Sequence, residues 1–536
     1  MKIFKTVMRW PLAAILMFGC LSVGMKASVQ TQSTKARLIT VIVVDGLRPD
    51  SINDEDTPNL FRLRREGIAY INSHSVFPTV TRVNAAALST GTYPIHNGLV
   101  SNVMYVPGVD PVRPFNTGDY RQLLKMQDVS NGTLLFRETL GERLQKAGLK
   151  YVAVSSGSTG NALLLNSRAP SGIGVVINGS FDPGKTVAYP ADISKTILSR
   201  FGEAPTEERS PRVDWTEKVL REYVLPELHP DVLIDWLTEP DTSQHEKGAG
   251  SVEARAALKN SDRNIGLFLK RLEELGLADK TDIIVLSDHG FTRNGYGINL
   301  TEELVNAKLK ASANSDDVVL ASNGNSVLLH VKGKDKQRIK QIVEFLQKQS
   351  WSGSIFTDQK PAAAGQHSGP NGWVEGTFSL DLIHEGNPER GPDIMFTFLW
   401  NSAPNASGMP GTDYINSRTS GPLTGEASGH GSISPYTIRN TMLMWGPDFK
   451  SATVIRTPSA NVDVMPTILA LKNLPITGQV DGRVLREAFR DGGVDEEQVI
   501  TETSTLTTQA GDGYKIAIQL SRVGSSIYVD KSWRVR

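Results

Sequence analysis

Short apolar runs alternate with longer amphipathic stretches from Arg37 onward. The first run, residues 38–44, reads Leu-Ile-Thr-Val-Ile-Val-Val, which is typical of a strand buried on both faces. Strands and helices that alternate in this way predict an α/β domain built on a mostly parallel sheet flanked by helices.

The same pattern predicts further elements along the chain. We expect helices at residues 58–66, 83–89, 134–147, 252–275 and 459–471, and strands at 68–75, 151–155, 232–237, 282–287 and 441–445.

The pattern of apolar and polar residues changes between residues 301 and 420. A strand at 326–331, an amphipathic helix at 336–347, a Gly/Pro-rich stretch at 361–372 and a strand at 394–399 suggest a small inserted α+β cap over the active site. The catalytic core would then comprise residues 37–300 and 421–536, the latter with a C-terminal tail. The alternative is that 301–420 is further sheet and loop of the main domain.

The N-terminus has the pattern of a secretory signal. Lys2, Lys5 and Arg9 precede an apolar run from Trp10 to Val23, and polar sequence follows. The run is shorter than the roughly 20 residues that span a bilayer as a helix. We therefore expect a signal peptide at 1–27 and an exported, periplasmic or secreted protein, with an uncleaved anchor as the alternative.

The only cysteine, Cys20, lies inside this segment. Gly19 before it fits a degenerate lipoprotein site, whereas the bulky Phe18 argues against one. Unless the chain is lipidated there, the mature protein has no membrane attachment and no cysteine, hence no disulfide or thiolate metal site.

Composition excludes some partners. The 57 Lys and Arg residues balance the 57 Asp and Glu residues. A neutral total gives no electrostatic signal for nucleic-acid binding.

Candidate chemistry lies where predicted strands end. Asp45, Asp241 and Asp288 each follow such a strand. The carboxyl ends of strands in open α/β sheets border the functional crevice, so these carboxylates should converge. Taken singly, each aspartate is equally a turn former or a helix cap.

Histidines strengthen this set. His245 comes four residues after Asp241, His289 adjoins Asp288, and His430 lies between two glycines. Mixed Asp and His ligands suit zinc without thiolates. Alone, each histidine is as well explained by a structural hydrogen bond.

Thr81 is the candidate nucleophile, just before a short Ala-rich helix. Free backbone N–H groups at a helix start favour a bound phosphate, and a metal can lower the pKa of the hydroxyl. Thr79 is the rival hydroxyl, and Thr81 would otherwise be an ordinary N-cap.

Taken together, the sequence resembles the type I phosphodiesterase/nucleotide pyrophosphatase family of the alkaline phosphatase superfamily. The motifs that carry the resemblance are Val-Val-Asp45-Gly, Phe-Pro-Thr-Val-Thr81, Tyr93-Pro-Ile-His-Asn-Gly98, Asp241-Thr-Ser-Gln-His245, Ser-Asp288-His289-Gly and Gly-His430-Gly.

The resemblance implies an alkaline-phosphatase-like fold and two Zn²⁺ ions per chain. One zinc would be held by Asp241, His245 and His430. The second would be held by Asp45, Asp288 and His289, with Thr81 bridging to it. Asn102 and the Thr81 backbone N–H would bind a phosphoryl oxygen.

One position departs from many nucleotide-cleaving relatives, which carry an aromatic residue directly after the nucleophile. Here that residue is Arg82. It either contacts a phosphate or carboxylate of the substrate, or pairs with a surface acid. Lys125 and Arg168 are further loose candidates for cations that a monoester would need.

The leading hypothesis is a phosphohydrolase that cleaves phosphodiester or pyrophosphate bonds of a small phosphorylated substrate through a phospho-threonine intermediate. The runner-up is a phosphomonoesterase or phosphonoacetate-type hydrolase with the same site. A hypothesis of another class is an inactive, metal-stabilised surface protein that binds partners. A sulfatase is disfavoured because no cysteine lies beyond Cys20.

Overall fold

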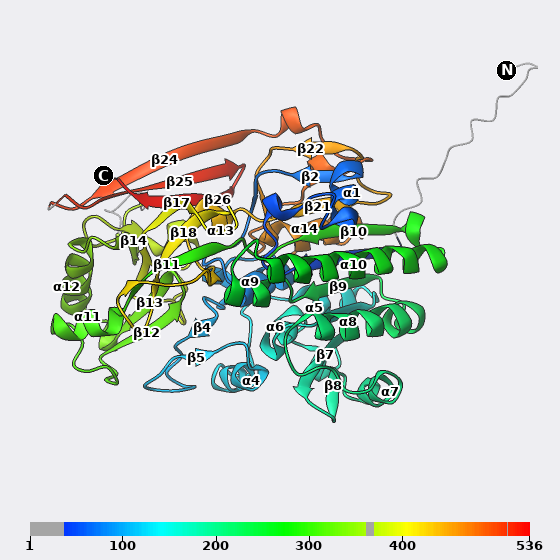
Figure 1. Cartoon of the computed structure of the whole chain (residues 1–536), viewed down its shortest axis with the longest axis horizontal. Coiled ribbons are helices and arrows are strands. Elements are labelled where there is room, and N and C mark those ends of the chain that lie inside the picture. The colour runs from blue at the N-terminus through cyan, green and yellow to red at the C-terminus, as the bar shows by residue number, and fades with distance from the viewer. Residues whose placement is uncertain (1–36, 361–368, 512, 536) are drawn as a thin grey trace, which may run out of the picture. The chain divides into compact units, whose positions relative to one another are not determined.

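A nine-stranded sheet organises the computed structural model, which describes residues 37–360, 369–511 and 513–535 (Figure 1). Its strands lie in the order β22 (Thr453–Ile455), β2 (Ile68–Tyr70), β21 (Met442–Trp445), β10 (Thr281–Leu286), β1 (Leu38–Val44), β9 (Val232–Leu237), β6 (Tyr151–Ser155), β7 (Val175–Asp182) and β8 (Thr186–Tyr189).

The middle of this sheet is parallel. β1 pairs in parallel with β10 and β9, and β6 pairs in parallel with β9 and β7. Only β21 and β8 run antiparallel to their neighbours in this sheet. The sequence-based α/β expectation with a mostly parallel central sheet is therefore confirmed.

Helices cover both faces, which is why β1 is apolar throughout. Ile39, Val41 and Val43 pack into one core, and Ile42 and Val44 pack into the other. The first core includes α2 (Thr81–Thr90), α5 (Leu140–Lys146), α6 (Thr159–Leu165) and α14 (Val464–Leu471). The second includes α1 (Pro58–Glu66), α8 (Ser210–Val219) and α10 (Val252–Glu274).

Two further sheets are formed by strands that follow β10 along the chain. One has the order β12 (Val318–Asn323), β13 (Ser326–Val331), β16 (Ile394–Phe398), β14 (Ser352–Thr357) and β15 (Phe378–Ser379). The other has β17 (Trp400–Pro404), β18 (Pro410–Asn416), β11 (Thr292–Ile298) and β19 (Gly421–Pro422), with β20 (Ser428–Gly429) also paired to β11.

These sheets share a core with the main sheet. Leu328 and Phe396 belong to the same buried cluster as Ala85 of α2. Residues 35–536 accordingly form one compact unit. The division into a core and a cap at 301–420 stays a prediction, and β11 already begins at Thr292.

The C-terminal segment forms an antiparallel three-stranded sheet of β24 (Thr501–Gln509), β25 (Lys515–Val523) and β26 (Ser526–Arg534). The sequence was interpreted there only as a tail. β24 is largely exposed, whereas Tyr514, Ile516 and Ile518 are fully buried, so one side of the sheet packs on the rest of the unit.

The remaining elements are short. They are α3 (Pro94–Asn97), α4 (Tyr120–Val129), α7 (Asp192–Phe201), α9 (Asp241–Lys247), α11 (Leu300–Asn306), α12 (Lys336–Gln347), α13 (Pro435–Ile438), β3 (Ser73–His74), β4 (Val103–Met104), β5 (Phe115–Asn116), β23 (Ser459–Ala460), the π-helix η3 (Leu220–Leu228), and the 3-10 helices η1 (Pro49–Ser51), η2 (Ala169–Ser171), η4 (Ala278–Lys280), η5 (Lys332–Lys334), η6 (Leu380–Ile383), η7 (Asn461–Asp463), η8 (Arg486–Ala488) and η9 (Glu496–Gln498).

Most predicted elements are present, and the differences have local causes. The helix expected from residue 134 begins only at Leu140, because Thr139 and Glu142 form a capping box there. The expected strand 68–75 is split into β2 and β3, and the expected helix 459–471 begins as β23 and η7 before α14.

The signal peptide expected at 1–27 and Cys20 lie outside the described residues. Among the described helices, none has a stretch both long enough and apolar enough to cross a membrane.

Helix α2 is tightly packed on nearly all sides. Nine of its ten residues are buried, and it carries Thr81 at its first position. Its alanines allow this close packing, because larger side chains would push the helix away from the sheet.

We predict that Ala86→Leu, which adds volume at a fully buried site, destabilises the protein by about 1–3 kcal/mol through overpacking. Thermal or denaturant unfolding measures this change. Ala256→Leu on the exposed side of α10 is the control and should leave stability nearly unchanged. Equal stability of the two variants would contradict the tight packing of α2.

Candidate active site

The strand-end aspartates converge as expected. Asp45 directly follows β1, Asp288 follows β10 after one residue, and Asp241 opens α9 just beyond β9. Because β1 lies between β9 and β10 in parallel, their carboxyl ends meet at one edge of the sheet.

His289 is fully buried at the centre of these carboxylates. Its Nε2 lies 3.1 Å from Asp288 Oδ2, 3.6 Å from Asp45 Oδ1 and 3.9 Å from Asp241 Oδ1. The ring is fixed from behind, since Nδ1 donates to the Gly290 carbonyl at 3.1 Å. Nε2 is therefore the ring nitrogen that faces the carboxylates.

The carboxylates are also held in place. Trp236 Nε1 donates to Asp45 Oδ2 at 2.9 Å, and the Gly46 and His289 backbone N–H groups donate to Asp288 Oδ1 at 3.0 Å. These hydrogen bonds to Asp45 Oδ2 and Asp288 Oδ1 orient the two carboxylates. The other oxygens, Asp45 Oδ1 and Asp288 Oδ2, lie toward His289.

Two further histidines join Asp241. The Nε2 atoms of His245 and His430 lie 3.5 and 3.7 Å from Asp241 Oδ1, and 3.1 Å from each other. Their Nδ1 atoms donate to the carbonyls of Ser428 and Thr79. Two Nε2 lone pairs at this distance repel unless a cation or a proton lies between them.

The electrostatics of the set favour a bound cation. Asp45 Oδ1, Asp241 Oδ1 and Asp288 Oδ2 are buried without a hydrogen-bond partner among the described residues. Burial, together with the charges of Asp288 and Asp241, raises the pKa of Asp45 well above its usual range. Burial beside His289 and His245 lowers the pKa of His430 well below its usual value.

Among the described residues, two groups of side chains can hold a metal ion: Asp241 with His245 and His430, and Asp45 with Asp241 and His289. Asp288, expected in the second group, lies beside it through its 3.1 Å contact with His289. Carboxylate oxygens without partners and neutral imidazole nitrogens are ligands that zinc accepts, so the residues fit the expected metal.

Thr81 lies beside these groups at the N-terminus of α2. Its Oγ1 is 3.4 Å from His289 Nε2. Thr79, the rival hydroxyl, is occupied elsewhere, since its Oγ1 donates to the Ser432 carbonyl at 2.9 Å and accepts from the Gly431 N–H at 3.1 Å. Thr79 therefore holds the loop that carries His430.

A cavity of about 360 Å³ opens over Thr81. It is lined by Val80, Thr81, Arg82, Asn102, Val103, Asp241, His245, Asn294, Ser322, Asn323, Gly324, Ile415, Ser428, Gly429 and His430. Asn102 Oδ1 accepts from the Arg82 backbone N–H at 2.9 Å. The expected residues Arg82 and Asn102 thus both lie in the wall next to the candidate nucleophile, whereas Lys125 and Arg168 are not among the lining residues.

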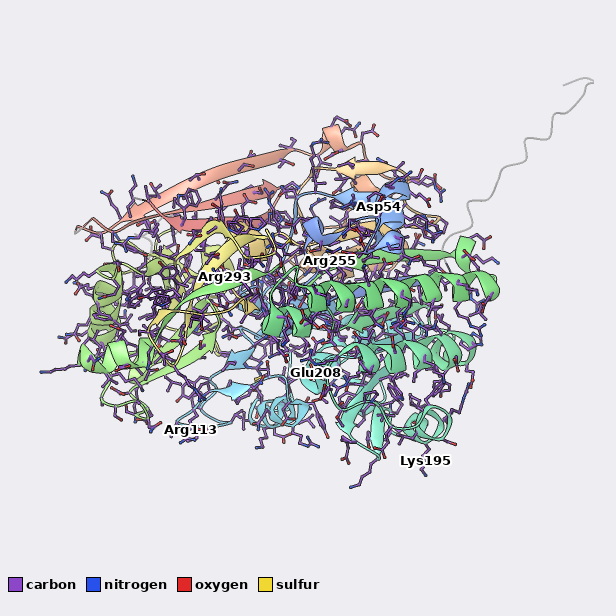
Figure 2. All side chains as sticks on the ribbon, viewed as in Figure 1. Asp54, Arg113, Lys195, Glu208, Arg255 and Arg293 are labelled. Atoms are coloured by element: carbon purple, nitrogen blue, oxygen red, sulfur yellow. The ribbon has the colours of Figure 1, made fainter. Side chains whose placement is uncertain are left out.

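Several wall residues were not anticipated. Asn294, Ser322 and Asn323 come from β11 and the β12–β13 hairpin, where no motif marks them. Glu208, labelled in Figure 2, was also missed, although its charge acts on Arg82. Asn294, Ser322 and Asn323 lie on β11 and β12, where nothing in the local sequence marks them, and only the folded chain brings them to the site.

The tip of the β12–β13 hairpin touches the loop of His430. Gly324 has a positive φ of 65°, and a Cβ there would lie 2.6 Å from the His430 carbonyl oxygen. Only glycine allows this approach without a shift of one backbone segment.

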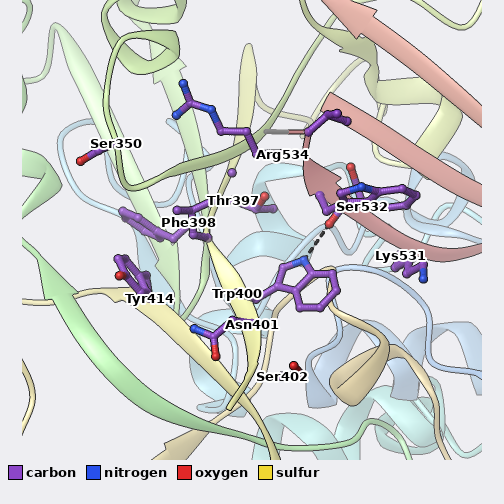
Figure 3. Close-up of a pocket in the computed structure, with 14 residues that line it drawn as sticks. Ser350, Thr397, Phe398, Trp400, Asn401, Ser402, Tyr414, Lys531, Ser532 and Arg534 are labelled. Atoms are coloured by element: carbon purple, nitrogen blue, oxygen red, sulfur yellow. Dashed lines mark hydrogen bonds between the residues drawn. The ribbon is translucent and has the colours of Figure 1, made fainter. Parts of the chain in front are cut away.

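A larger cavity of about 780 Å³ lies elsewhere, between β16 to β18 and β26 (Figure 3). Its wall includes Trp400, whose indole N–H donates to the Ser532 carbonyl at 2.7 Å, together with Tyr414 and Arg534. No carboxylate or histidine is among its lining residues, so it lacks the groups that the hydrolytic chemistry requires.

Comparisons with known proteins agree with this geometry. A family model described as type I phosphodiesterase / nucleotide pyrophosphatase matches residues 39–400. Human ectonucleotide pyrophosphatase/phosphodiesterase family member 7 is 26% identical over 291 residues, which cover 53% of this chain and 55% of that protein. Venom phosphodiesterase 2 of Crotalus adamanteus is 28% identical over 251 residues, 46% of this chain and 26% of that protein.

This chain therefore spans about half the length of the first of these relatives and about a quarter of the second. A solved structure of murine ectonucleotide pyrophosphatase / phosphodiesterase 5 covers 82% of this chain and 97% of its own, with a TM-score of 0.54 and 16% identity. That likeness concerns the fold. An inactive variant of the murine protein, solved in complex with AMP, matches equally well.

We predict that Gly324→Ala moves the hairpin tip and the His430 loop apart. Hydrogen exchange of backbone amides should rise both near residue 324 and near residue 430. Gly333→Ala is the matched control, because its φ of 68° imposes the same strain but its Cβ meets nothing within 4 Å. Equal exchange in both variants would show that the contact with His430 is unimportant.

Proposed function

Since the chain belongs to the type I phosphodiesterase/nucleotide pyrophosphatase family, we propose that it is a two-zinc hydrolase of phosphodiester or pyrophosphate bonds in small phosphorylated substrates. One observation carries the proposal. Three buried carboxylate oxygens without hydrogen-bond partners and three histidine Nε2 atoms converge beside the Thr81 hydroxyl at the start of a helix.

The residues divide into two metal-holding sets. Asp241, His245 and His430 would hold one zinc, and Asp45, Asp288 and His289 the other, with Thr81 beside the second. When bound, zinc supplies positive charge that lowers the pKa of a hydroxyl and neutralises phosphoryl oxygens. Asp241 supports this arrangement because its Oδ1 lies between His245 and His289, at 3.5 and 3.9 Å from their Nε2 atoms.

Thr81 acts as the nucleophile. Its Oγ1 forms a bond to phosphorus, the bond from phosphorus to the leaving oxygen breaks, and a phospho-threonine results. Water then cleaves this ester and returns the threonine. Thr81 suits the role because its side chain faces His289 and its helix start favours negative charge.

Asn102 would bind a phosphoryl oxygen alongside the Thr81 backbone N–H. Its Oδ1 accepts from the Arg82 backbone N–H, so Nδ2 is the side-chain atom that can donate to a ligand in the cavity that Asn102 lines. Backbone N–H groups and an oriented amide are pre-positioned donors for the charge that develops in the transition state.

A second candidate function is hydrolysis of a phosphomonoester or a phosphonoacetate-type phosphonate by the same residues. The cation Arg82 in the cavity wall favours it, because such substrates carry additional negative charge. An inactive binding protein is disfavoured because all seven metal-binding and nucleophilic positions hold competent residues.

We also propose export to the periplasm or the exterior, and a cap formed by residues 301–420. The N-terminal sequence pattern supports export, and the matched relatives are named venom and ecto enzymes. The β12–β13 hairpin in the cavity wall supports a cap that shapes the substrate site.

We predict that Thr81→Ala lowers turnover of an aryl phosphodiester by at least about 10³-fold, because the nucleophile is lost. Zinc content by mass spectrometry should stay unchanged. Thr81→Ser retains a hydroxyl and serves as the control that keeps measurable turnover. Undiminished activity of the alanine variant would remove Thr81 as the nucleophile.

We predict that chelation abolishes activity and that added zinc restores it.

We predict that His430→Ala weakens binding of one zinc per chain, since the number of ligands sets affinity. Zinc titration by calorimetry measures the change. His229→Asn is the control, because this histidine is exposed at a φ of 49° that asparagine tolerates. Two zinc sites of unchanged affinity in the His430 variant would refute the assignment.

A further inference from the structure

Arg82 carries a positive charge in the wall of the cavity and has no acidic partner. Its Nε donates to Thr117 Oγ1 at 3.5 Å, and an Nη donates to Asn116 Oδ1 at 3.2 Å. Both acceptors are neutral. Among the described residues, no carboxylate oxygen lies within the 4.0 Å of an ion pair with this guanidinium, so Arg82 is not held by a surface acid.

Nearby acidic residues stabilise the charged form of the Arg82 guanidinium. Burial lowers the pKa of Arg82, and the charges of Glu208 and the metal-site aspartates oppose that effect. Glu208 itself is engaged with Arg212, at 3.7 Å. Arg82 is only partly buried, so its unused N–H donors are free to bind acceptors that a ligand in the cavity supplies.

Much of the rest of the wall is polar, although Val80, Val103 and Ile415 also line it. Asn294, Ser322 and Asn323 face the cavity, and histidines are the only ring-bearing residues among those that line it. Nucleobases are usually recognised by stacking on aromatic side chains. A cavity of about 360 Å³ with this wall suits a compact, charged group better than a base.

We infer that Arg82 is a specificity-determining residue that binds an anion, and that the substrate is a small phosphoryl or phosphonyl compound with a second anionic group. This inference rests on the proposed hydrolytic function. A carboxylate and a terminal phosphate share the geometry that a guanidinium fork recognises with two hydrogen bonds.

A closed set of hydrogen bonds fixes where this anion binds relative to the nucleophile. The Thr117 Oγ1 that accepts from Arg82 donates to the Asn102 carbonyl at 2.7 Å, and Asn102 Oδ1 accepts from the Arg82 backbone at 2.9 Å. Thr117 and Asn116 are therefore positioning residues. They tie the guanidinium to the amide that faces the phosphoryl group.

The test compares four substrates of the full-length, zinc-loaded enzyme. Bis(4-nitrophenyl) phosphate has no second anion, a thymidine 4-nitrophenyl diester adds a base, phosphonoacetate adds a carboxylate, and inorganic pyrophosphate adds a phosphate. We expect Arg82→Gln to lower kcat/KM by about 10- to 100-fold for the last two substrates, mainly through KM. The aryl diester should change less than about threefold, because it makes no charged contact with Arg82.

Two more variants keep this test informative. Arg82→Lys preserves the charge without the fork, so its loss on the anionic substrates should be intermediate. Arg121→Gln removes an arginine whose side chain is 57% exposed and which lies outside the cavity wall, and it should behave as wild type. Zinc content and thermal unfolding of every variant exclude a general loss of structure.

The outcomes separate the two proposals. No zinc-dependent turnover of any substrate by the wild type overturns the proposed function and this inference with it. Turnover of the aryl diester with an equal loss on all substrates in Arg82→Gln, a preference for the thymidine diester, or no turnover of either anionic substrate overturns only this inference. The anionic substrate with the larger loss identifies a carboxylate or a phosphate as the natural second anion.

Discussion

The mutual repulsion of three carboxylates that converge at one edge of the main sheet is the constraint on which the rest of the site depends. Asp45, Asp241 and Asp288 are brought together because parallel strands end at one edge of the sheet. Burial and neighbouring charge raise the pKa of Asp45, so the group is unfavourable as anions unless cations occupy it. Hydrogen bonds from Nδ1 fix the rings of His289 and His430, and the helix that begins at Thr81 lies next to them. Together these groups form one site in which bound cations would attract an anion.

The parts of this site that the sequence predicted have local signals. Asp45 and Asp288 follow apolar runs long enough to be read as buried strands, and Thr81 precedes a short helix of small residues. The parts that it did not predict depend on distant segments. Asn116 and Asn323 are the last residues of the strands β5 and β12, and nothing near them in the chain reveals that they meet around Arg82 and Asn102. The C-terminal strands were missed for a similar reason, because the polar, exposed β24 lacks an alternating apolar pattern.

The substrate cavity is built by two layers of the molecule. The main sheet supplies the carboxylates, whereas β11 and the β12–β13 hairpin supply most of the neutral polar wall. Thr79 links the two, since its hydroxyl holds the loop of His430 two residues before the nucleophile. The groups proposed to react and several neutral residues of the wall therefore come from different parts of the chain, whereas the proposed anion-binding residue, Arg82, lies on α2 next to Thr81.

The position of β21 has a consequence for the order in which the protein assembles. This strand, residues 442–445, lies between β2 and β10, which were synthesised long before it. Until β21 and the later β22 are added, one edge of β10 and both edges of β2 expose backbone groups without partners in the sheet. A nascent chain that already carries all three aspartates therefore still has open strand edges, which are sites where other chains can pair until β21 is added.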